Sequence, residues 1–209
     1  MKTNGVCSLV YIQLISEVDN EEIIESMEYL ISEYKDHIAP FSAKLIHVFM
    51  VSFERVIGAD NEDSIAAWEC LRAIKIVLGA IEKCPQQFRE AENLVMPVIS
   101  KYFTSDNEYF EDFIQIISTF AMYSESISEL LWNLFPVISA ACLEWAIDYI
   151  KDILYCFDNM ICSDPETFIK RNYITEIIKI YELASRIEID DEYHQPACQL
   201  MECAIQNSG

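Results

Sequence analysis

One tetrapeptide, Pro-Val-Ile-Ser, occurs twice in this chain, at Pro97–Ser100 and Pro136–Ser139. The two copies lie 39 residues apart, and an Asn-Leu step precedes each of them. Each copy also lies inside a segment whose apolar residues follow the rhythm of an amphipathic helix. The same helix recurring at this distance predicts a helical hairpin that repeats along the chain and packs against its own neighbour.

A spacing near 40 residues is typical of HEAT and armadillo repeats, whose period is roughly 40 to 47 residues. Composition agrees, because four Gly and six Pro in 209 residues leave few tight turns, and a hydrophobic fraction of 52% can fill a core. We therefore predict an all-α fold, a HEAT-repeat α-solenoid of stacked antiparallel helical hairpins. Such arrays are binding surfaces more often than enzymes.

The chain is expected to divide into three parts. Residues 1–18 form a partial repeat with only its second helix, residues 19–187 form about four HEAT-like hairpins, and residues 188–209 begin a further, truncated hairpin. This division suggests a piece of a longer array. The expected helices cover residues 20–38, 41–57, 64–83, 86–103, 109–123, 126–144, 145–161, 173–187 and 192–206.

Local signals set the expected ends of these helices. Capping-box spacing, a Ser or Asp followed three residues later by Glu, occurs at Asp19 and Glu22, Ser105 and Glu108, and Ser126 and Glu129. Ala39-Pro40 and Gly58 are expected to end helices. Pro97 and Pro136 fall inside helices and are expected to bend them, since proline removes an N–H group and clashes with the preceding turn.

The charge of the chain limits its partners. A formal net charge of −21, from 35 acidic and 14 basic residues, argues against nucleic acid and anionic membranes, which need clustered Lys and Arg. It favours basic protein partners, whose encounter an acidic surface accelerates. The alternative stays open that the acidic charge only keeps a hydrophobic protein dissolved. The sequence contains no run of about 18 uncharged apolar residues, so it predicts no transmembrane helix.

Residues for catalysis or metal binding are sparse. None of the eight Cys forms a C-x-x-C pair, and Cys142 and Cys156 fall on apolar faces, which suits a reducing compartment such as the cytosol or nucleus. His194 and Cys198 would share a helix face with Cys203 beyond them, but zinc needs about four ligands. No glycine-rich phosphate loop or nucleophile motif occurs. We predict no enzyme, no cofactor and no metal.

Three segments carry a resemblance to a known family. Ile31–Ile57 has Glu-Tyr, an intervening Pro and a helix ending in Val-Ile, Leu131–Ile153 has Trp-x-Leu-x-Pro followed by Asp-Tyr, and Tyr173–Ala184 follows in the same order. Together they resemble nuclear transport receptors of the importin-β (karyopherin-β) family, in the branch of importin seven and importin eight. The resemblance is to a middle-to-C-terminal fragment of these long superhelices.

That resemblance implies a function. It implies nuclear import of basic cargo proteins such as ribosomal proteins or histones, weak contacts with Phe-Gly nucleoporins between outer helices, and residence in cytoplasm and nucleus. It also implies regulation by Ran, through N-terminal repeats that this chain lacks. Two alternatives remain: a HEAT-repeat scaffold subunit of another protein assembly, and, less favoured, an all-helical enzyme.

Candidate partner-binding residues follow from the repeat geometry. The second helix of each hairpin usually lines the concave side of such an array, and an acidic loop offers a second place for a basic partner. Each carboxylate has the ordinary alternative of being plain solvated surface. The candidates are Glu54, Glu90, Glu92, Glu129, Glu144, Glu176 and Glu182 on second helices, with Asp60, Glu62 and Asp63 in the loop.

Overall fold

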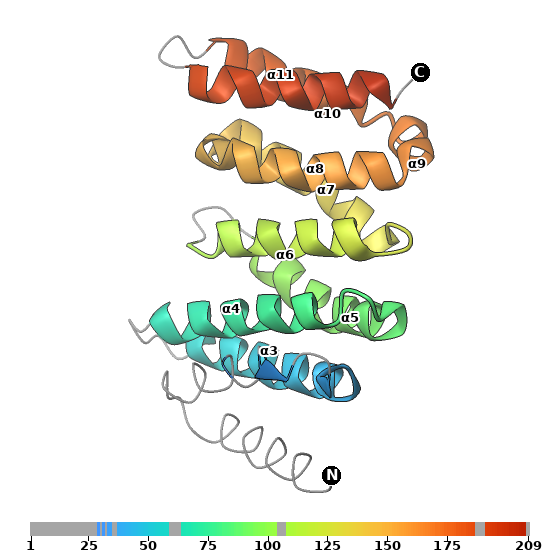
Figure 1. Ribbon diagram of the computed structural model, residues 1–209. Coiled ribbons are helices and arrows are strands. Elements are labelled where there is room, and N and C mark those ends of the chain that lie inside the picture. Colours follow the sequence, from blue (N-terminus) through green and yellow to red (C-terminus); the bar gives the residue numbers. More distant parts are fainter. Residues whose placement is uncertain are drawn as a thin grey trace, which may run out of the picture. The chain divides into compact units, whose positions relative to one another are not determined.

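The computed structural model describes residues 29, 31, 33, 34, 37–58, 64–103, 108–186 and 191–207, and every regular element in them is a helix. These helices are η2 (Ala39–Phe41), α3 (Ser42–Gly58), α4 (Ser64–Ala80), α5 (Pro85–Tyr102), α6 (Phe110–Tyr123), α7 (Glu129–Glu144), η3 (Ile147–Tyr149), α8 (Ile150–Ser163), α9 (Pro165–Lys170), α10 (Ile174–Arg186) and α11 (Asp191–Gln206) (Figure 1). The predicted all-α class is therefore confirmed. The chain divides into two compact units, and the boundary along the sequence follows Lys101.

In the first unit, α3 packs against α4. Leu45, Phe49 and Phe53 recur every four residues on α3 and are at most 2% exposed, so they form one buried stripe. The expected break at Ala39-Pro40 takes the form of the short helix η2, and the Ser42 hydroxyl donates to the carbonyl oxygen of Ala39 at 2.9 Å. Gly58 is the last residue of α3, as expected.

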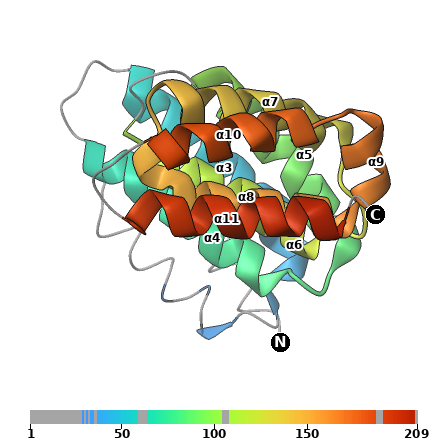
Figure 2. The same cartoon turned by 90° about the horizontal axis from the view of Figure 1, so that it is seen from above.

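In the second unit the helices form two layers. The first layer contains α6, α8 and α11, because α8 packs against both α6 and α11. The second contains α7 and α10, which pack against each other, while α10 also packs against α11. Figure 2 shows α8 and α11 on one side and α7 and α10 on the other. Pairs of helices in two layers are the arrangement that HEAT repeats require.

Hydrogen bonds between the helices of this unit recur at one sequence distance. Asn159 Nδ2 donates to Ser118 Oγ, 41 residues away, and Ser163 Oγ donates to the Ala121 carbonyl, 42 residues away. The Tyr173 hydroxyl bonds the Trp132 carbonyl, also 41 residues away. Each helix therefore meets its counterpart one HEAT period later, which confirms the HEAT-like solenoid that the repeated tetrapeptide predicts.

Both repeated prolines lie inside helices as predicted, Pro97 in α5 and Pro136 in α7. Because Pro136 has no N–H group, the carbonyl of Trp132 loses its usual partner in the helix. The Tyr173 hydroxyl takes that place and donates to the Trp132 oxygen at 3.1 Å. The bend that each proline is expected to cause remains a prediction.

Several predicted helix starts are wrong. Helix α7 begins at Glu129, not at residue 126, because Ser128 has extended backbone angles and its side chain accepts the N–H of Leu131 at 3.2 Å. Ser128, not Ser126, is therefore the N-cap of α7. Helix α6 begins at Phe110 with Tyr109 as its N-cap, so Glu108 precedes the helix; its expected partner Ser105 lies outside the described residues, as do Asp19 and Glu22.

Two further differences concern the segment between α7 and α10. The helix expected from residue 145 begins later, as η3 at Ile147 followed by α8 at Ile150. Helix α9 is an addition to the expected set. Asp164 caps it, since its Oδ1 accepts the N–H of Thr167 at 3.1 Å, and Pro165 occupies the first position, where a missing N–H group is harmless.

No single helix in the described ranges is long and apolar enough to cross a membrane. Residues Glu129–Glu144 and Ile147–Ser163 reach that length and apolarity only as a pair, and they are bent by 119° at the break between them. The parts predicted for residues 1–18, most of 19–38 and 188–190 lie outside the described residues. The division into repeats stays a prediction.

Candidate functional site

Four of the predicted partner-binding carboxylates lie in one layer of the second unit. Glu129 and Glu144 are the first and last residues of α7, and Glu176 and Glu182 lie on α10, which packs against α7. Glu54 and Glu90 lie on α3 and α5 in the first unit. The acidic loop of Asp60, Glu62 and Asp63 lies outside the described residues. We call the first four residues the α7–α10 acidic layer.

Three members of this layer already pair with cations of the same chain. Glu176 accepts from Lys179 at 2.8 Å, and Glu182 lies 3.7 Å from Arg186, both at the short helical spacings that bring side chains together. Glu129 pairs with Arg171 at 2.5 Å. In the first unit, Glu54 pairs with Lys101 of α5 at 2.7 Å. A basic partner would have to share or displace these cations.

The Glu144 carboxylate is different from the other three. It is exposed, and no ion pair joins it to another of the described residues. It is also the last residue of α7, where the partial negative charge of a helix end disfavours a carboxylate. A cation from outside the chain would therefore gain more at Glu144 than at the paired members of the layer.

Glu92, unlike the other candidates on described helices, is buried. Its exposure is 2%, so its side chain does not lie on an open face, and a partner contact at Glu92 stays a prediction. The reason for the burial is its position on α5, four residues after the buried Phe88 and three before the buried Val95, which places it on the core stripe. Glu90 is exposed as expected, and Gln86 Nε2 donates to it at 3.4 Å.

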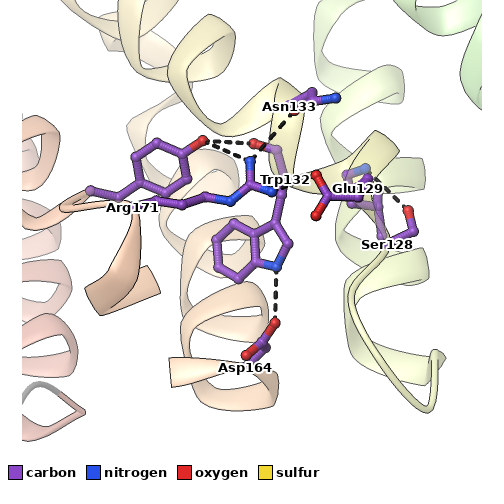
Figure 3. A network of polar contacts seen from close by, with 8 residues as sticks. Ser128, Glu129, Trp132, Asn133, Asp164 and Arg171 are labelled. Carbon is purple, nitrogen blue, oxygen red and sulfur yellow. Dashed lines mark hydrogen bonds and ion pairs between the residues drawn. The ribbon is translucent and has the colours of Figure 1, made fainter. Parts of the chain in front are cut away.

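A polar network at the junction of α7, α9 and α10 fixes the position of Glu129 (Figure 3). The Arg171 guanidinium donates to Glu129 Oε2 at 2.5 Å, and to Asn133 Oδ1 and the Tyr173 hydroxyl at 3.5 Å each. Arg171 is a quarter exposed whereas Glu129 is 79% exposed. The network therefore holds the cation against the protein and presents the carboxylate to solvent.

The same network includes Asp164, whose two carboxylate oxygens both accept hydrogen bonds. Its Oδ2 accepts the indole N–H of Trp132 at 3.1 Å (Figure 3). Its Oδ1 accepts the N–H of Thr167 at 3.1 Å. Burial favours the neutral carboxyl group, but the hydrogen bonds from Thr167 and Trp132 and the charge of Arg171 outweigh it and lower the pKa of Asp164. The carboxylate is thus ionised and joins α7 to the start of α9.

Stacked aromatic rings support this junction from within. The Phe135 ring stacks on Tyr173 with centroids 4.5 Å apart at 6°, and on Phe157 with centroids 4.0 Å apart at 19°. Phe135 and Phe157 are fully buried. Such ring pairs add to the stabilisation that burial gives. They join the helices α7 and α8 and the residue before α10, and α7 and α10 are the helices that carry the acidic layer.

The cysteine and histidine residues separate into different environments. Cys142 and Cys156 are fully buried, and burial raises the pKa of each thiol to about 12, which is the apolar role predicted for them. Cys198 Sγ lies 3.9 Å from either ring nitrogen of His194. Cys203 is not with them, because it faces Asp158 and Cys162 of α8.

Comparison with known proteins finds several similar sequences, three of them as follows. An importin beta-like SAD2 homologue of Arabidopsis thaliana is 28% identical over 94% of this chain, and a probable importin-7 homologue of Dictyostelium discoideum is 29% identical over 93%. Over most of its length this chain is similar to importin-β-like proteins. Importin-8 of Mus musculus is 17% identical over 80% of the chain. No family model and no solved structure matches.

The chain spans about a fifth of the length of these relatives, 20%, 19% and 17% respectively. The resemblance drawn from three sequence segments is confirmed. Two of these segments hold three of the four residues of the acidic layer, because Leu131–Ile153 includes Glu144 and Tyr173–Ala184 includes Glu176 and Glu182. Glu129 lies two residues before the first segment.

Sequence patterns did not reveal the polar network of this chain. Arg171, Asp164 and Tyr173 each bond residues 32 to 42 positions away, beyond the reach of helical spacing rules. One signal was present: Asp164 followed by Pro165 is a typical helix start. It identifies α9, although it does not identify the partners of Asp164.

Proposed function

We propose that this chain is a segment of a nuclear import receptor that carries basic protein cargo through the nuclear pore under the control of Ran. The supporting observation is the match to importin-β-like relatives across 94% and 93% of the chain. Because the chain spans only about a fifth of those proteins, the cargo, nucleoporin and Ran contacts of a complete receptor are part of the proposal. Its role is binding, without catalysis or a cofactor, in both cytoplasm and nucleus.

The α7–α10 acidic layer is the proposed surface for cargo. Three of its carboxylates have internal cations and Glu144 has none among the described residues, so Glu144 is the expected first contact for a Lys or Arg of the cargo. The overall charge of −21 would steer a basic protein toward the chain at low salt. Charge contacts of this exposed kind set the rate and selectivity of association more than its final strength.

The opposite layer offers apolar side chains for Phe-Gly nucleoporin repeats. Met122 of α6, Tyr155 of α8 and Ile205 of α11 are 58%, 68% and 61% exposed. Isolated apolar side chains are ordinary on a protein surface, so they support weak contacts only. Contact with Ran is assigned to repeats of the complete receptor outside this chain.

Binding of a histone and of a Phe-Gly peptide by the full chain, measured separately between about 50 and about 300 mM salt, tests the proposal. Histone binding should weaken as salt rises, whereas peptide binding should change little. The variant Glu144→Lys should weaken histone binding about tenfold, since like charges facing each other are strongly unfavourable. Glu202→Lys, an exposed residue of α11 with the same change of charge, is the matched control and should stay within about twofold.

The result also separates the proposal from a scaffold of another assembly. A scaffold has no need of Phe-Gly repeats, so absence of both interactions would contradict a receptor segment with working surfaces. Equal losses in Glu144→Lys and Glu202→Lys would show that net charge alone matters and would contradict the assignment to the acidic layer.

A further inference from the structure

Three side chains with metal-binding atoms meet between α8 and α11. Asp158 and Cys162 are four residues apart on α8 and therefore share a helix face. Cys203 of α11 faces them, and one carboxylate oxygen and the two sulfur atoms all lie within 4.8 Å of one another. We call these three residues the α8–α11 thiol cluster.

The surroundings of the thiol cluster are partly enclosed. Cys203 is 8% exposed and Asp158 is half-buried, whereas Cys162 is exposed, so solvent reaches the cluster at Cys162. Asn207 closes another side. Its Nδ2 is held by the Cys203 carbonyl at 2.9 Å and lies 3.9 Å from the sulfur of Cys162 and 3.8 Å from that of Cys203.

This set of donor atoms suits a borderline-soft divalent cation. Zinc takes thiolate sulfur at about 2.3 Å and carboxylate oxygen at about 2.0 to 2.2 Å, so two donors on a tetrahedral zinc lie roughly 3.5 to 3.8 Å apart. The cluster already lies within 4.8 Å, and small side-chain rotations would close the difference. Calcium and magnesium prefer oxygen donors and fit poorly.

We propose that Asp158, Cys162 and Cys203 bind one Zn²⁺ ion and thereby clamp α8 to α11. As each Zn–S bond forms, the thiol releases its proton to solvent. Three protein ligands leave a fourth position for water on the open side, next to Cys162. The Asn207 amide would donate to the two thiolates and hold them in place, as outer hydrogen bonds do at zinc sites.

This site is independent of cargo binding and could not be found from sequence spacing. Cys162 and Cys203 are 41 residues apart, about one HEAT period, so only the packing of α8 against α11 brings them together. The pairing of His194 with Cys198 that the sequence pattern indicated uses a different part of α11.

Titration of the full, untagged and fully reduced chain with Co²⁺, followed by displacement with Zn²⁺, tests the site. A tetrahedral site with two thiolates gives sulfur-to-cobalt charge-transfer absorption in the near ultraviolet, which a surface ion lacks. One equivalent should bind with this band, and Zn²⁺ should abolish it. Competition with a chromophoric chelator gives the Zn²⁺ dissociation constant.

Variants connect the signal to the residues. Cys162→Ser is the main variant because Cys162 is exposed and its replacement should preserve folding, and it should weaken Zn²⁺ binding about 100-fold or more. Asp158→Asn should weaken it about tenfold. Cys198→Ser, on the same helix α11 but outside the cluster, is the matched control and should stay within about twofold.

The proposal is overturned by either of two results. One is absence of the charge-transfer band at saturating Co²⁺ with all thiols confirmed as reduced. The other is a Zn²⁺ affinity in Cys162→Ser equal to that of the parent chain. A rise in melting temperature with Zn²⁺ in the parent but not in Cys162→Ser would support the clamp, since a ligand stabilises the folded state it binds.

Discussion

The hydrogen bond that the Tyr173 hydroxyl donates to the Trp132 carbonyl can be tested by removing one atom. In α7, Pro136 leaves the carbonyl of Trp132 without a helical partner, and the Tyr173 hydroxyl donates to that oxygen at 3.1 Å. Trp132 is 1% exposed, so water does not readily replace the donor. The variant Tyr173→Phe removes the donor and keeps the ring that stacks on Phe135.

The expected loss follows from this geometry. A buried acceptor left without a donor costs about 1 to 3 kcal/mol in the free energy of unfolding. Tyr173 is only half-buried and its weaker contact with Arg171 is 3.5 Å long, so we place the loss at about 1 to 2 kcal/mol. The matched control Tyr155→Phe changes a 68% exposed residue and should shift stability by less than about 0.5 kcal/mol.

A second variant tests the cause. Pro136 is exposed, and Pro136→Ala restores an N–H group that can bond the Trp132 carbonyl within the helix. In that background, Tyr173→Phe should cost about 0.5 kcal/mol or less, which gives a coupling of about 1 kcal/mol between the two positions. Equilibrium urea unfolding of the four proteins, followed by far-ultraviolet circular dichroism, measures each free energy.

The reasoning would be refuted by an equal loss in both backgrounds. Such a result would mean that the Tyr173 hydroxyl stabilises the protein through another contact, and that the missing N–H group of Pro136 has no bearing on it. A loss below about 0.3 kcal/mol in the parent background would also contradict it, because a buried acceptor cannot lose its donor at so small a cost.

Three further predictions concern charge and thiol chemistry. The pKa of Asp164 is lower in the folded state, so the ionised carboxylate stabilises the fold fully above the unfolded pKa near 3.9, and this stabilisation is lost as pH falls through the lower folded value. Asp164→Asn should therefore flatten the loss of stability in acid, measured as urea midpoints between about pH 5 and pH 2. Glu129→Gln should cost less than about 1 kcal/mol, and less again at high salt in the same unfolding assay, because the carboxylate is 79% exposed. Exposed Cys162 should react with a thiol reagent in the native protein, whereas buried Cys142 and Cys156, with pKa values near 12, should react only after unfolding, as mass spectrometry of labelled peptides would show.

Helix existence was predictable from the sequence, but some helix starts were not. Apolar periodicity located α5 and α7 to within three residues and placed both repeated prolines inside them. It failed at the start of α7, where Ser126 and Ser128 are both plausible caps and the burial of Ile127 between them favours the later start. Helix α9 has six residues, too few for a periodic signal.

For the candidate site, the sequence identified the acidic residues, but it predicted their burial and their ion-pair partners only in part. The burial of Glu92 could have been expected, because it lies on the same stripe as Phe88 and Val95. The ion pair of Glu129 with Arg171 spans 42 residues and could not be expected, since it depends on how α7 packs beside α9 and α10. Helical spacing rules account for the two ion pairs within α10, whereas the Glu129–Arg171 pair joins separate elements and lies beyond those rules.

The regular 41- to 45-residue spacing of contacts in the second unit also bears on how the protein is made. Asn159 bonds Ser118, Tyr173 bonds Trp132, and Tyr193 bonds Asp148, each reaching back by about one repeat. A chain that leaves the ribosome from its N-terminus needs to add only about one repeat before each helix can meet its partner. Short sequence separations keep the entropic cost of each step small, so the unit can assemble in order during synthesis, with the most recently made helix as its exposed edge.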